Sequence, residues 1–161
     1  MMSLHQEKEI FRDALESISD RMNIDLAIIE KDYYVTMLLK QLVTLDSNFI
    51  FKGGTSLSKC YHCISRFSED IDINYMGYEN LSIGQKRKIK KTVMEAVQRC
   101  QLNIVNLDQT RSRRVFNRYR ISYSKVIEAN HYLKQEVILE TAFQTPSYPY
   151  HIHTKLRPFN R

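Results

Sequence analysis

The segment from residue 51 to residue 75, FKGGTSLSKCYHCISRFSEDIDINY, restricts the fold more than any other part of the chain. A β-type run, NFIFK at 48–52, stops at Gly53-Gly54, and DIDINYM at 70–76 then alternates acidic with apolar side chains. Alternation with a period of two is typical of a strand with one buried face. The sequence therefore predicts two strands separated by a glycine turn and a short helix.

Helical and strand-like patterns occupy the rest of the chain, which indicates an α/β fold. Apolar residues recur near helical spacing in the segments 5–20, 26–45 and 83–102. Strand-like runs follow at 103–109, 116–124 and 134–143. We expect the basic link TRSRRV to turn a hairpin between the first two of these runs, and the tail after them to be irregular. A chain of 161 residues is large enough to bury the core of one domain.

The charge balance is compatible with a polyanionic partner. The chain has 24 Lys and Arg against 18 Asp and Glu, a formal net charge of +6. Mildly basic proteins without such a partner are also common, so the charge alone does not decide. The start of the chain lacks the pattern of a signal peptide and no apolar run reaches membrane-spanning length, so we expect a cytoplasmic protein.

Two pairs of potential zinc ligands are weak candidates. Cys60 and Cys63 form a CxxC motif without a second pair, and residues three apart on a helix simply share a face. His151 and His153 lie among prolines, where a loop is the better interpretation. Three cysteines, an odd number, also argue against a disulfide framework.

Asp70 and Asp72 are candidate ligands of a hard cation. In a strand they project from the same face, while Ile71 and Ile73 face the core. Two carboxylates so close together repel each other unless a cation lies between them, and oxygen ligands suit Mg²⁺ or Mn²⁺. The alternative is an exposed edge strand with ordinary solvated acids.

The two glycines favour the cation interpretation. A strand that ends in Gly53-Gly54 and leads into a helix gathers free backbone N–H groups, which can receive a phosphate. Thr55 is expected to be the N-cap of that helix, and Thr55 or Ser56 can add a hydroxyl donor. A phosphate-binding turn next to a carboxylate pair predicts a site for a nucleoside triphosphate with its metal. The Walker loop and the dinucleotide fingerprint are both missing.

These motifs resemble one family. KGGTSLSKCY followed by RFSEDIDI is similar to the nucleotidyltransferase AbiEii/AbiGii toxin family of type IV toxin–antitoxin systems, within the DNA polymerase β-like nucleotidyltransferase superfamily. The superfamily pattern of Gly-Gly and acid-hydrophobic-acid-hydrophobic is met by Gly53-Gly54 and by residues 70–73, with a longer spacer than usual. IIEKDYYVTMLL at 28–39 resembles the family's Glu-Lys-Asp helix, and VILETAF resembles the strand that supplies a third acid, which would be Glu140.

The resemblance implies a nucleotidyltransferase fold, a small mixed sheet flanked by helices, and an enzyme. It would transfer a nucleoside monophosphate from an NTP to an acceptor hydroxyl. Asp70, Asp72 and Glu140 would be the catalytic residues and would hold two Mg²⁺ or Mn²⁺ ions. Glu140 would add a ligand and act as a base, although a solvent-facing residue of an edge strand is the alternative.

Residues around the glycine turn are expected to bind the nucleotide and its phosphates: Gly53, Gly54, Thr55, Ser56, Lys59, Arg66 and Ser68. Lys59 would point either back to the phosphates or out to solvent. Arg66 would neutralise phosphate charge, whereas Ser68 would serve only as a cap or form a local hydrogen bond. The resemblance implies that Lys31 and Asp32 support the site, for example through a salt bridge.

Family members usually continue into a helical C-terminal region, whereas this chain stops at Arg161. We therefore expect residues 1–161 to form one nucleotidyltransferase core domain without that region. A catalytically incomplete protein that binds RNA or a partner is one alternative. A protein- or small-molecule-modifying nucleotidyltransferase is another. A metal-dependent nuclease is disfavoured because Glu140 is followed by Thr-Ala where Glu-x-Lys is required.

RNA, and tRNA in particular, is the expected acceptor. Basic residues are dense at 86–91 and at 110–114, and Arg118, Tyr119 and Arg120 lie on a predicted strand. Basic side chains together with aromatic rings are what a nucleic-acid strand requires. The basic run at 86–91 is also typical of the solvated face of a helix. The family further implies a cognate antitoxin as a partner.

Overall fold

The computed structural model describes residues 3–59, 70–128 and 135–143, and it is a mixed α/β fold. Five strands form one sheet in the order β1-β2-β5-β4-β3. The pairs β1–β2, β5–β4 and β4–β3 are antiparallel, and β2 and β5 are parallel. The strands have these bounds: β1 Phe49–Lys52, β2 Asp70–Tyr75, β3 Asn103–Ile104, β4 Phe116–Ser122 and β5 Glu136–Ala142.

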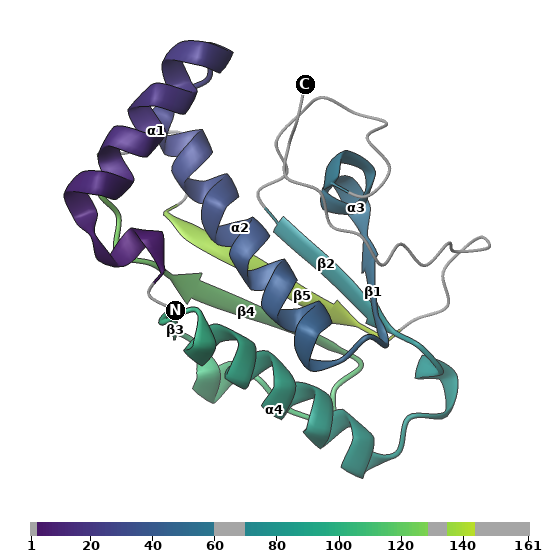
Figure 1. Ribbon diagram of the computed structural model, residues 1–161. Helices are drawn as coiled ribbons and strands as arrows, with labels where there is room; N and C mark the ends of the chain where they lie inside the picture. The colour runs from purple at the N-terminus through teal and green to yellow at the C-terminus, as the bar shows by residue number, and fades with distance from the viewer. Residues whose placement is uncertain (1–2, 60–69, 129–134, 144–161) are drawn as a thin grey trace.

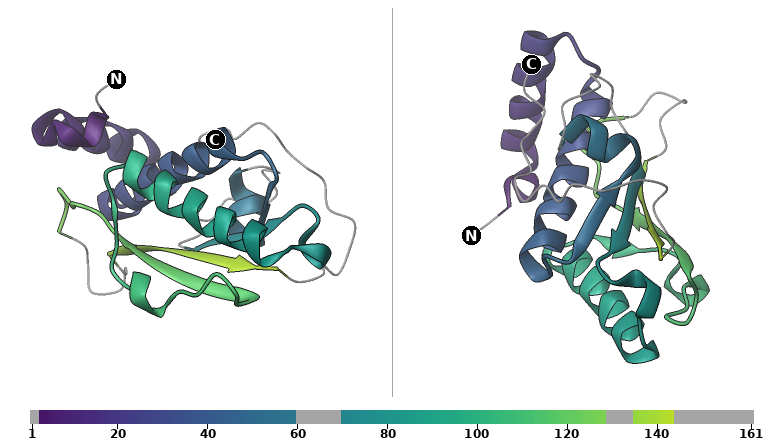
Figure 2. Two further views of the ribbon diagram at one scale, coloured as in Figure 1. Left: turned by 90° about the horizontal axis from the view of Figure 1, so that it is seen from below. Right: turned by 90° about the vertical axis from the view of Figure 1, so that its right-hand side faces the viewer.

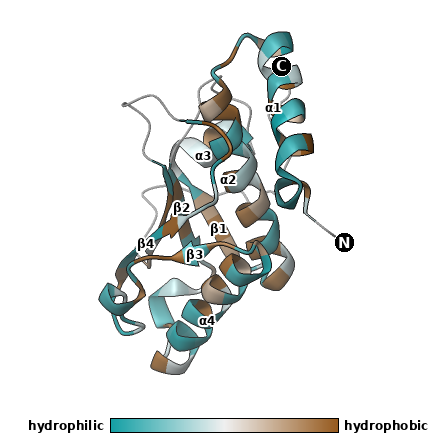
Figure 3. Cartoon of the chain, turned by 90° about the vertical axis from the view of Figure 1, so that its left-hand side faces the viewer, coloured by the Kyte–Doolittle hydropathy of each residue, from teal (hydrophilic) through white to brown (hydrophobic). Residues whose placement is uncertain are grey.

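The main helices lie on one side of this sheet (Figures 1 and 2). They have these bounds: α1 Lys8–Met22, α2 Leu26–Leu45, α3 Gly53–Lys59 and α4 Ile83–Arg99. Helix α2 packs against α1, α4 and β5, while α3 packs against β1 and β2. In Figure 3 hydrophilic and hydrophobic residues alternate along α1 and α4, as in helices that bury one face.

The strands follow the predicted period of two. The side chains that face the helices are almost fully buried; they include Ile71 and Ile73 of β2, Tyr119 and Ile121 of β4, and Val137 and Leu139 of β5. The alternate positions include two acids on β2, two arginines on β4 and two acids on β5. One face of the sheet therefore forms the core, and the opposite face carries the charge.

Most predicted elements are confirmed. The segment 26–45 is α2, and Ser82 caps α4 by accepting a hydrogen bond from the backbone N–H of Gln85 at 3.2 Å. The hairpin across the basic link is also confirmed, because β3 pairs with β4. Among the described residues, no helix is long and apolar enough to cross a membrane.

Two predicted elements were wrong in extent. The strand expected at 103–109 covers only Asn103–Ile104, and Leu107–Gln109 is a 3-10 helix. The strand stops because the side chain of Asn106 takes over the pairing: its Nδ2 donates to the Arg118 carbonyl and its Oδ1 accepts from the Arg120 N–H. The helix expected to begin after Thr55 begins at Gly53. The predicted irregular tail lies outside the described residues.

Candidate active site

One row of charged residues crosses the sheet. Asp72 of β2 is the register partner of Lys52 on β1 and of Glu140 on β5, and Glu140 is in turn the partner of Arg118 on β4. Register partners on neighbouring strands project to the same face. Two acidic and two basic side chains, one from each of four strands, therefore lie together on the face opposite the helices.

The carboxylates of Asp70 and Glu140 act electrostatically on that of Asp72. Asp70 lies two residues before Asp72, on the same face and more exposed. Burial raises the pKa of Asp72, the charges of Glu140 and Asp70 raise it further, and Lys52 opposes them. The structure thus brings together the acids that sequence reasoning selected, and their mutual repulsion is what a bound cation would relieve.

Gly53 lies directly against Asp72. It has a φ of 65°, and a Cβ at this position would overlap Oδ2 of Asp72 and lie 3.1 Å from its Cγ. Only glycine tolerates both the left-handed backbone and this close approach. Gly53 is therefore required by the turn that places the start of α3 beside the Asp72 carboxylate.

Thr55 is not the N-cap that was predicted. It lies inside α3, is buried, and its hydroxyl donates to the backbone carbonyl of Asp70. The left-handed Gly53 turns the chain from β1 straight into the helix, so α3 begins earlier and Thr55 faces β2 instead. Thr55 ties α3 to the first residue of β2, and Ser56 beside it is also buried.

Lys59 points to α2 rather than to the glycine turn or to solvent. Its Nζ lies 2.7 Å from Oδ1 of Asp32 and 2.7 Å from Oγ1 of Thr36, and its side chain is only 4% exposed. The resemblance implied that Asp32 supports the site, and in the structure Asp32 forms an ion pair with Lys59 of α3. Lys31 is buried as well.

Several predicted residues cannot be placed. Arg66 and Ser68 lie outside the described residues, and so do the candidate zinc ligands Cys60, Cys63 and His151 with its neighbour at 153. Their roles stay predictions.

The side chain of Glu140 is held by Arg118. Its Oε1 lies 2.6 Å from both Nε and Nη2 of the guanidinium. In the described part of the chain no group of three His, Cys, Asp or Glu side chains is arranged to hold a metal ion. The chemistry of the three acids nevertheless fits Mg²⁺ or Mn²⁺, because they offer only oxygen donors from one face of a sheet.

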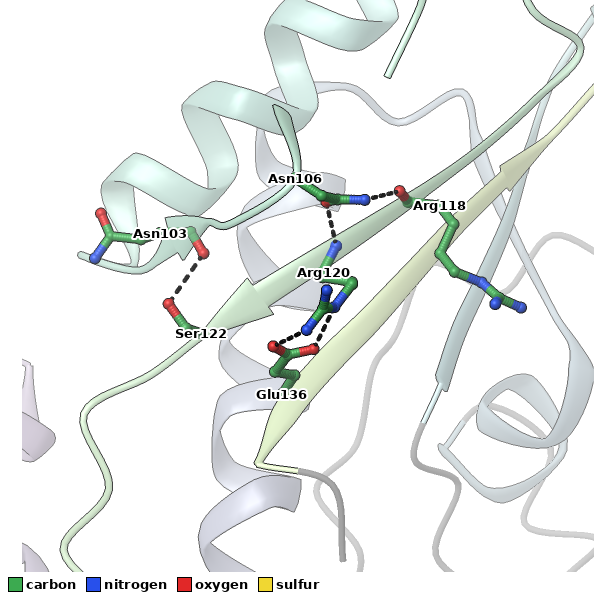
Figure 4. A network of polar contacts seen from close by, with 6 residues as sticks. All are labelled: Asn103, Asn106, Arg118, Arg120, Ser122 and Glu136. Atoms are coloured by element: carbon green, nitrogen blue, oxygen red, sulfur yellow. Dashed lines mark hydrogen bonds and ion pairs between the residues drawn. The ribbon is translucent and has the colours of Figure 1, made fainter. Parts of the chain in front are cut away.

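Next to the carboxylates lies a groove of about 830 Å³ on the same face. We call it the basic groove; its charged and aromatic lining consists of Asp70, Arg118, Arg120, Tyr123, Lys125 and Glu136. Figure 4 shows Arg120 paired with Glu136, through bonds of 2.7 and 2.8 Å. In the same view Asn106 holds the backbone of both arginines.

Sequence reasoning selected Asp70, Arg118 and Arg120 of this groove but missed the residue that holds its wall in place. Glu30 of α2 is buried and accepts from the N–H groups of Val126 and Ile127 at 2.7 and 3.3 Å. The loop that carries Lys125 is thereby fixed to α2. The available signal was a Glu in the middle of an apolar helix, since such a residue needs a partner when it is buried.

Comparison with known proteins found one matching family. The family described as "Nucleotidyl transferase AbiEii toxin, Type IV TA system" matches residues 37–156, which include the glycine turn and all three acids. No curated protein and no solved structure matches the chain. The chain belongs to the nucleotidyl transferase AbiEii toxin family of type IV toxin–antitoxin systems.

Proposed function

We propose that this toxin-family nucleotidyltransferase is metal-dependent and transfers a nucleoside monophosphate from an NTP to a hydroxyl of RNA, with tRNA as the first candidate. The acceptor hydroxyl gives its proton to Glu140, the candidate base, and its oxygen attacks the α-phosphorus. The bond from this phosphorus to the oxygen that bridges to the β-phosphate breaks, and pyrophosphate leaves. A cognate antitoxin would be the partner that controls this activity.

One observation carries the proposal: Asp72 lies against Gly53 and in register with Glu140. The turn that would receive the triphosphate therefore shares one face with the acids that would hold its metal ions. An ordinary exposed edge strand does not explain this arrangement, because β2 is an inner strand, between β1 and β5.

Asp70, Asp72 and Glu140 would hold two Mg²⁺ or Mn²⁺ ions. When bound, such ions lower the pKa of the attacking hydroxyl and stabilise the charge on the leaving pyrophosphate.

The protein's own groups would orient the substrates. The backbone at Gly53 and Gly54 and the hydroxyl of Ser56 would contact the β- and γ-phosphates. The basic residues of β4 would attract the phosphates of the acceptor. We leave Lys59 out of this set, because its ammonium is already bonded to Asp32 and Thr36.

The test is to incubate the protein with each α-³²P-labelled NTP, Mg²⁺ and total cellular RNA, and then to separate the products. We expect label on tRNA with the wild type, and none with Asp72→Asn. Asp20→Asn, an exposed acid on α1, is the matched control and should label like the wild type. Label on protein or on a small molecule would redirect the proposal to those acceptors.

A second candidate is a catalytically incomplete protein that binds RNA or a partner. The observation in its favour is the Arg118–Glu140 pair, which occupies the carboxylate that metal binding needs. Label on no acceptor, from a protein that still binds RNA, would select this candidate.

A further inference from the structure

Building on the proposed function, we infer that the basic groove binds the phosphodiester backbone of a single-stranded acceptor, and that Arg118 becomes available to it when a cation takes Glu140. The acceptor site and the metal site are then coupled through one side chain.

The position of the groove agrees with an acceptor site. Strand β2 lies between β1, which leads into the glycine turn, and β5, which with β4 forms the groove. Asp70 lines the groove, whereas Asp72 touches Gly53. The carboxylates therefore separate a turn suited to a triphosphate from a groove suited to the second substrate.

The shape and charge of the groove favour one strand over a duplex. A volume of about 830 Å³ is within the range of pockets that hold small ligands, so it accommodates only the last nucleotides of a strand. Arg118 and Arg120 are two residues apart on β4, so both project to the same face. Lys125 lies beyond the end of the strand and also lines the groove. Guanidinium groups are well suited to phosphate, which they bind through two N–H groups.

The walls of the groove are held rigidly. Tyr123 stacks on Tyr34 of α2, with ring centroids 4.3 Å apart and an interplanar angle of 23°. The hydroxyl of Tyr34 donates to the Ser124 carbonyl at 3.0 Å. A groove that is formed before the ligand arrives loses less entropy on binding.

The charge of the groove changes with the metal site. Both arginines are paired with acids, Arg118 with Glu140 and Arg120 with Glu136, and a paired guanidinium attracts a phosphate less strongly. A cation at the three acids would compete with Arg118 for Glu140 and release its guanidinium. Glu136 is not one of these acids, so Arg120 would keep its partner. By linkage, the cation and the acceptor must then strengthen each other's binding.

The test measures two equilibria that do not require transfer. A fluorescein-labelled single-stranded RNA of about ten nucleotides reports acceptor binding by anisotropy. The electron paramagnetic resonance signal of free Mn²⁺ reports cation binding. We expect Mn²⁺ to tighten RNA binding to the wild type about 5–10-fold, a typical size for coupling between two sites.

The variants separate the roles of the two arginines. Arg118→Gln should bind Mn²⁺ several-fold more tightly without RNA, and its RNA affinity should no longer depend on Mn²⁺. Glu140→Gln should bind RNA without Mn²⁺ as tightly as the wild type binds it with Mn²⁺. Arg120→Gln, the matched control on the same strand, should weaken RNA binding at every Mn²⁺ concentration and leave Mn²⁺ affinity unchanged. Arg21→Gln, exposed on α1, should change neither.

Several results would overturn the inference. One is RNA binding by Arg118→Gln and Arg120→Gln that equals that of Arg21→Gln. Another is equal affinity for a duplex of the same length. Loss of NTP binding rather than RNA binding would assign the groove to the triphosphate, and binding of an acidic peptide in place of RNA would assign it to a protein partner. If the protein transfers label to RNA but these variants do not change RNA or Mn²⁺ binding, only the inference is refuted. If RNA and Mn²⁺ binding are coupled but no label is transferred, only the proposed enzymatic function is refuted.

Discussion

Gly53 and Asp72 touch so closely that no side chain fits between them: a Cβ on Gly53 would overlap the carboxylate. The glycine turn and the acidic strand therefore act as one unit, because the position of the carboxylate depends on the backbone of the turn.

Gly53→Ala should displace the Asp72 carboxylate and abolish Mn²⁺ binding and nucleotidyl transfer. It should also cost about 1–3 kcal/mol of stability, since alanine is strained at positive φ. Gly77→Ala is the matched control, because Gly77 has a φ of 72° and a Cβ added to it would meet nothing within 4 Å. Both variants should lose stability in urea, and only Gly53→Ala should lose Mn²⁺. Equal Mn²⁺ binding by the two variants would show that the contact with Asp72 does not matter.

Lys59 should act through stability rather than through nucleotide binding. Lys59→Met leaves Asp32 without its partner and should cost about 3 kcal/mol, as is typical when one member of a buried ion pair is removed. The double variant Lys59→Met/Asp32→Asn should be less destabilised than the sum of the two single variants. Urea denaturation of all four proteins measures this coupling.

The nucleotide affinity of that double variant should equal the wild-type value by isothermal titration. A folded double variant that no longer binds NTP would return Lys59 to the phosphate site that the sequence suggested.

Glu30 should hold the wall of the basic groove in place. Glu30→Gln loses one of two acceptor oxygens for the Val126 and Ile127 amides, and should cost about 1–3 kcal/mol. Hydrogen exchange of these two amides should accelerate, and RNA binding should weaken. Glu128→Gln, at an exposed position in the same loop, is the control and should leave exchange unchanged. Unchanged protection in Glu30→Gln would mean that the loop is held by other contacts.

Asp46 should make stability depend on pH at the acidic end. Burial opposes its ionisation, but hydrogen bonds from the Tyr75 hydroxyl at 2.7 Å and from Asn48 outweigh this effect and lower the pKa of Asp46. A lowered pKa contributes stability that is present above the unfolded value of about 3.9 and is lost as the pH falls through the folded value.

Asp46→Asn should therefore unfold more easily than the wild type at pH 7, by about 1.5–3 kcal/mol, and the difference should shrink below about pH 4. Urea denaturation across this range measures it, with Asp20→Asn as the exposed control. A difference that is independent of pH would show that the effect comes from the shape of the side chain and not from its charge.

The sequence by itself determined the local features of this protein. The alternation in DIDINYM placed Asp70 and Asp72 on one face, and the apolar period of roughly 26–45 predicted α2. The resemblance then pointed to Glu140 as a third acid. These conclusions hold because strand and helix periods depend on neighbours in the chain.

Tertiary structure decided which of these residues meet. The parallel register of β2 and β5 sets Glu140 beside Asp72, and the antiparallel register of β4 sets Arg118 beside Glu140. Lys59 is buried against α2, where it pairs with Asp32, and so points away from the glycine turn. The side chain of Asn106 ends the strand that the local sequence at 103–109 had predicted, because it bonds to β4 in place of the backbone. The periodicity of apolar residues along a strand or helix determines the face on which a side chain lies. Which residue that side chain contacts depends on strand register and burial, and these are set by packing between segments distant in the chain.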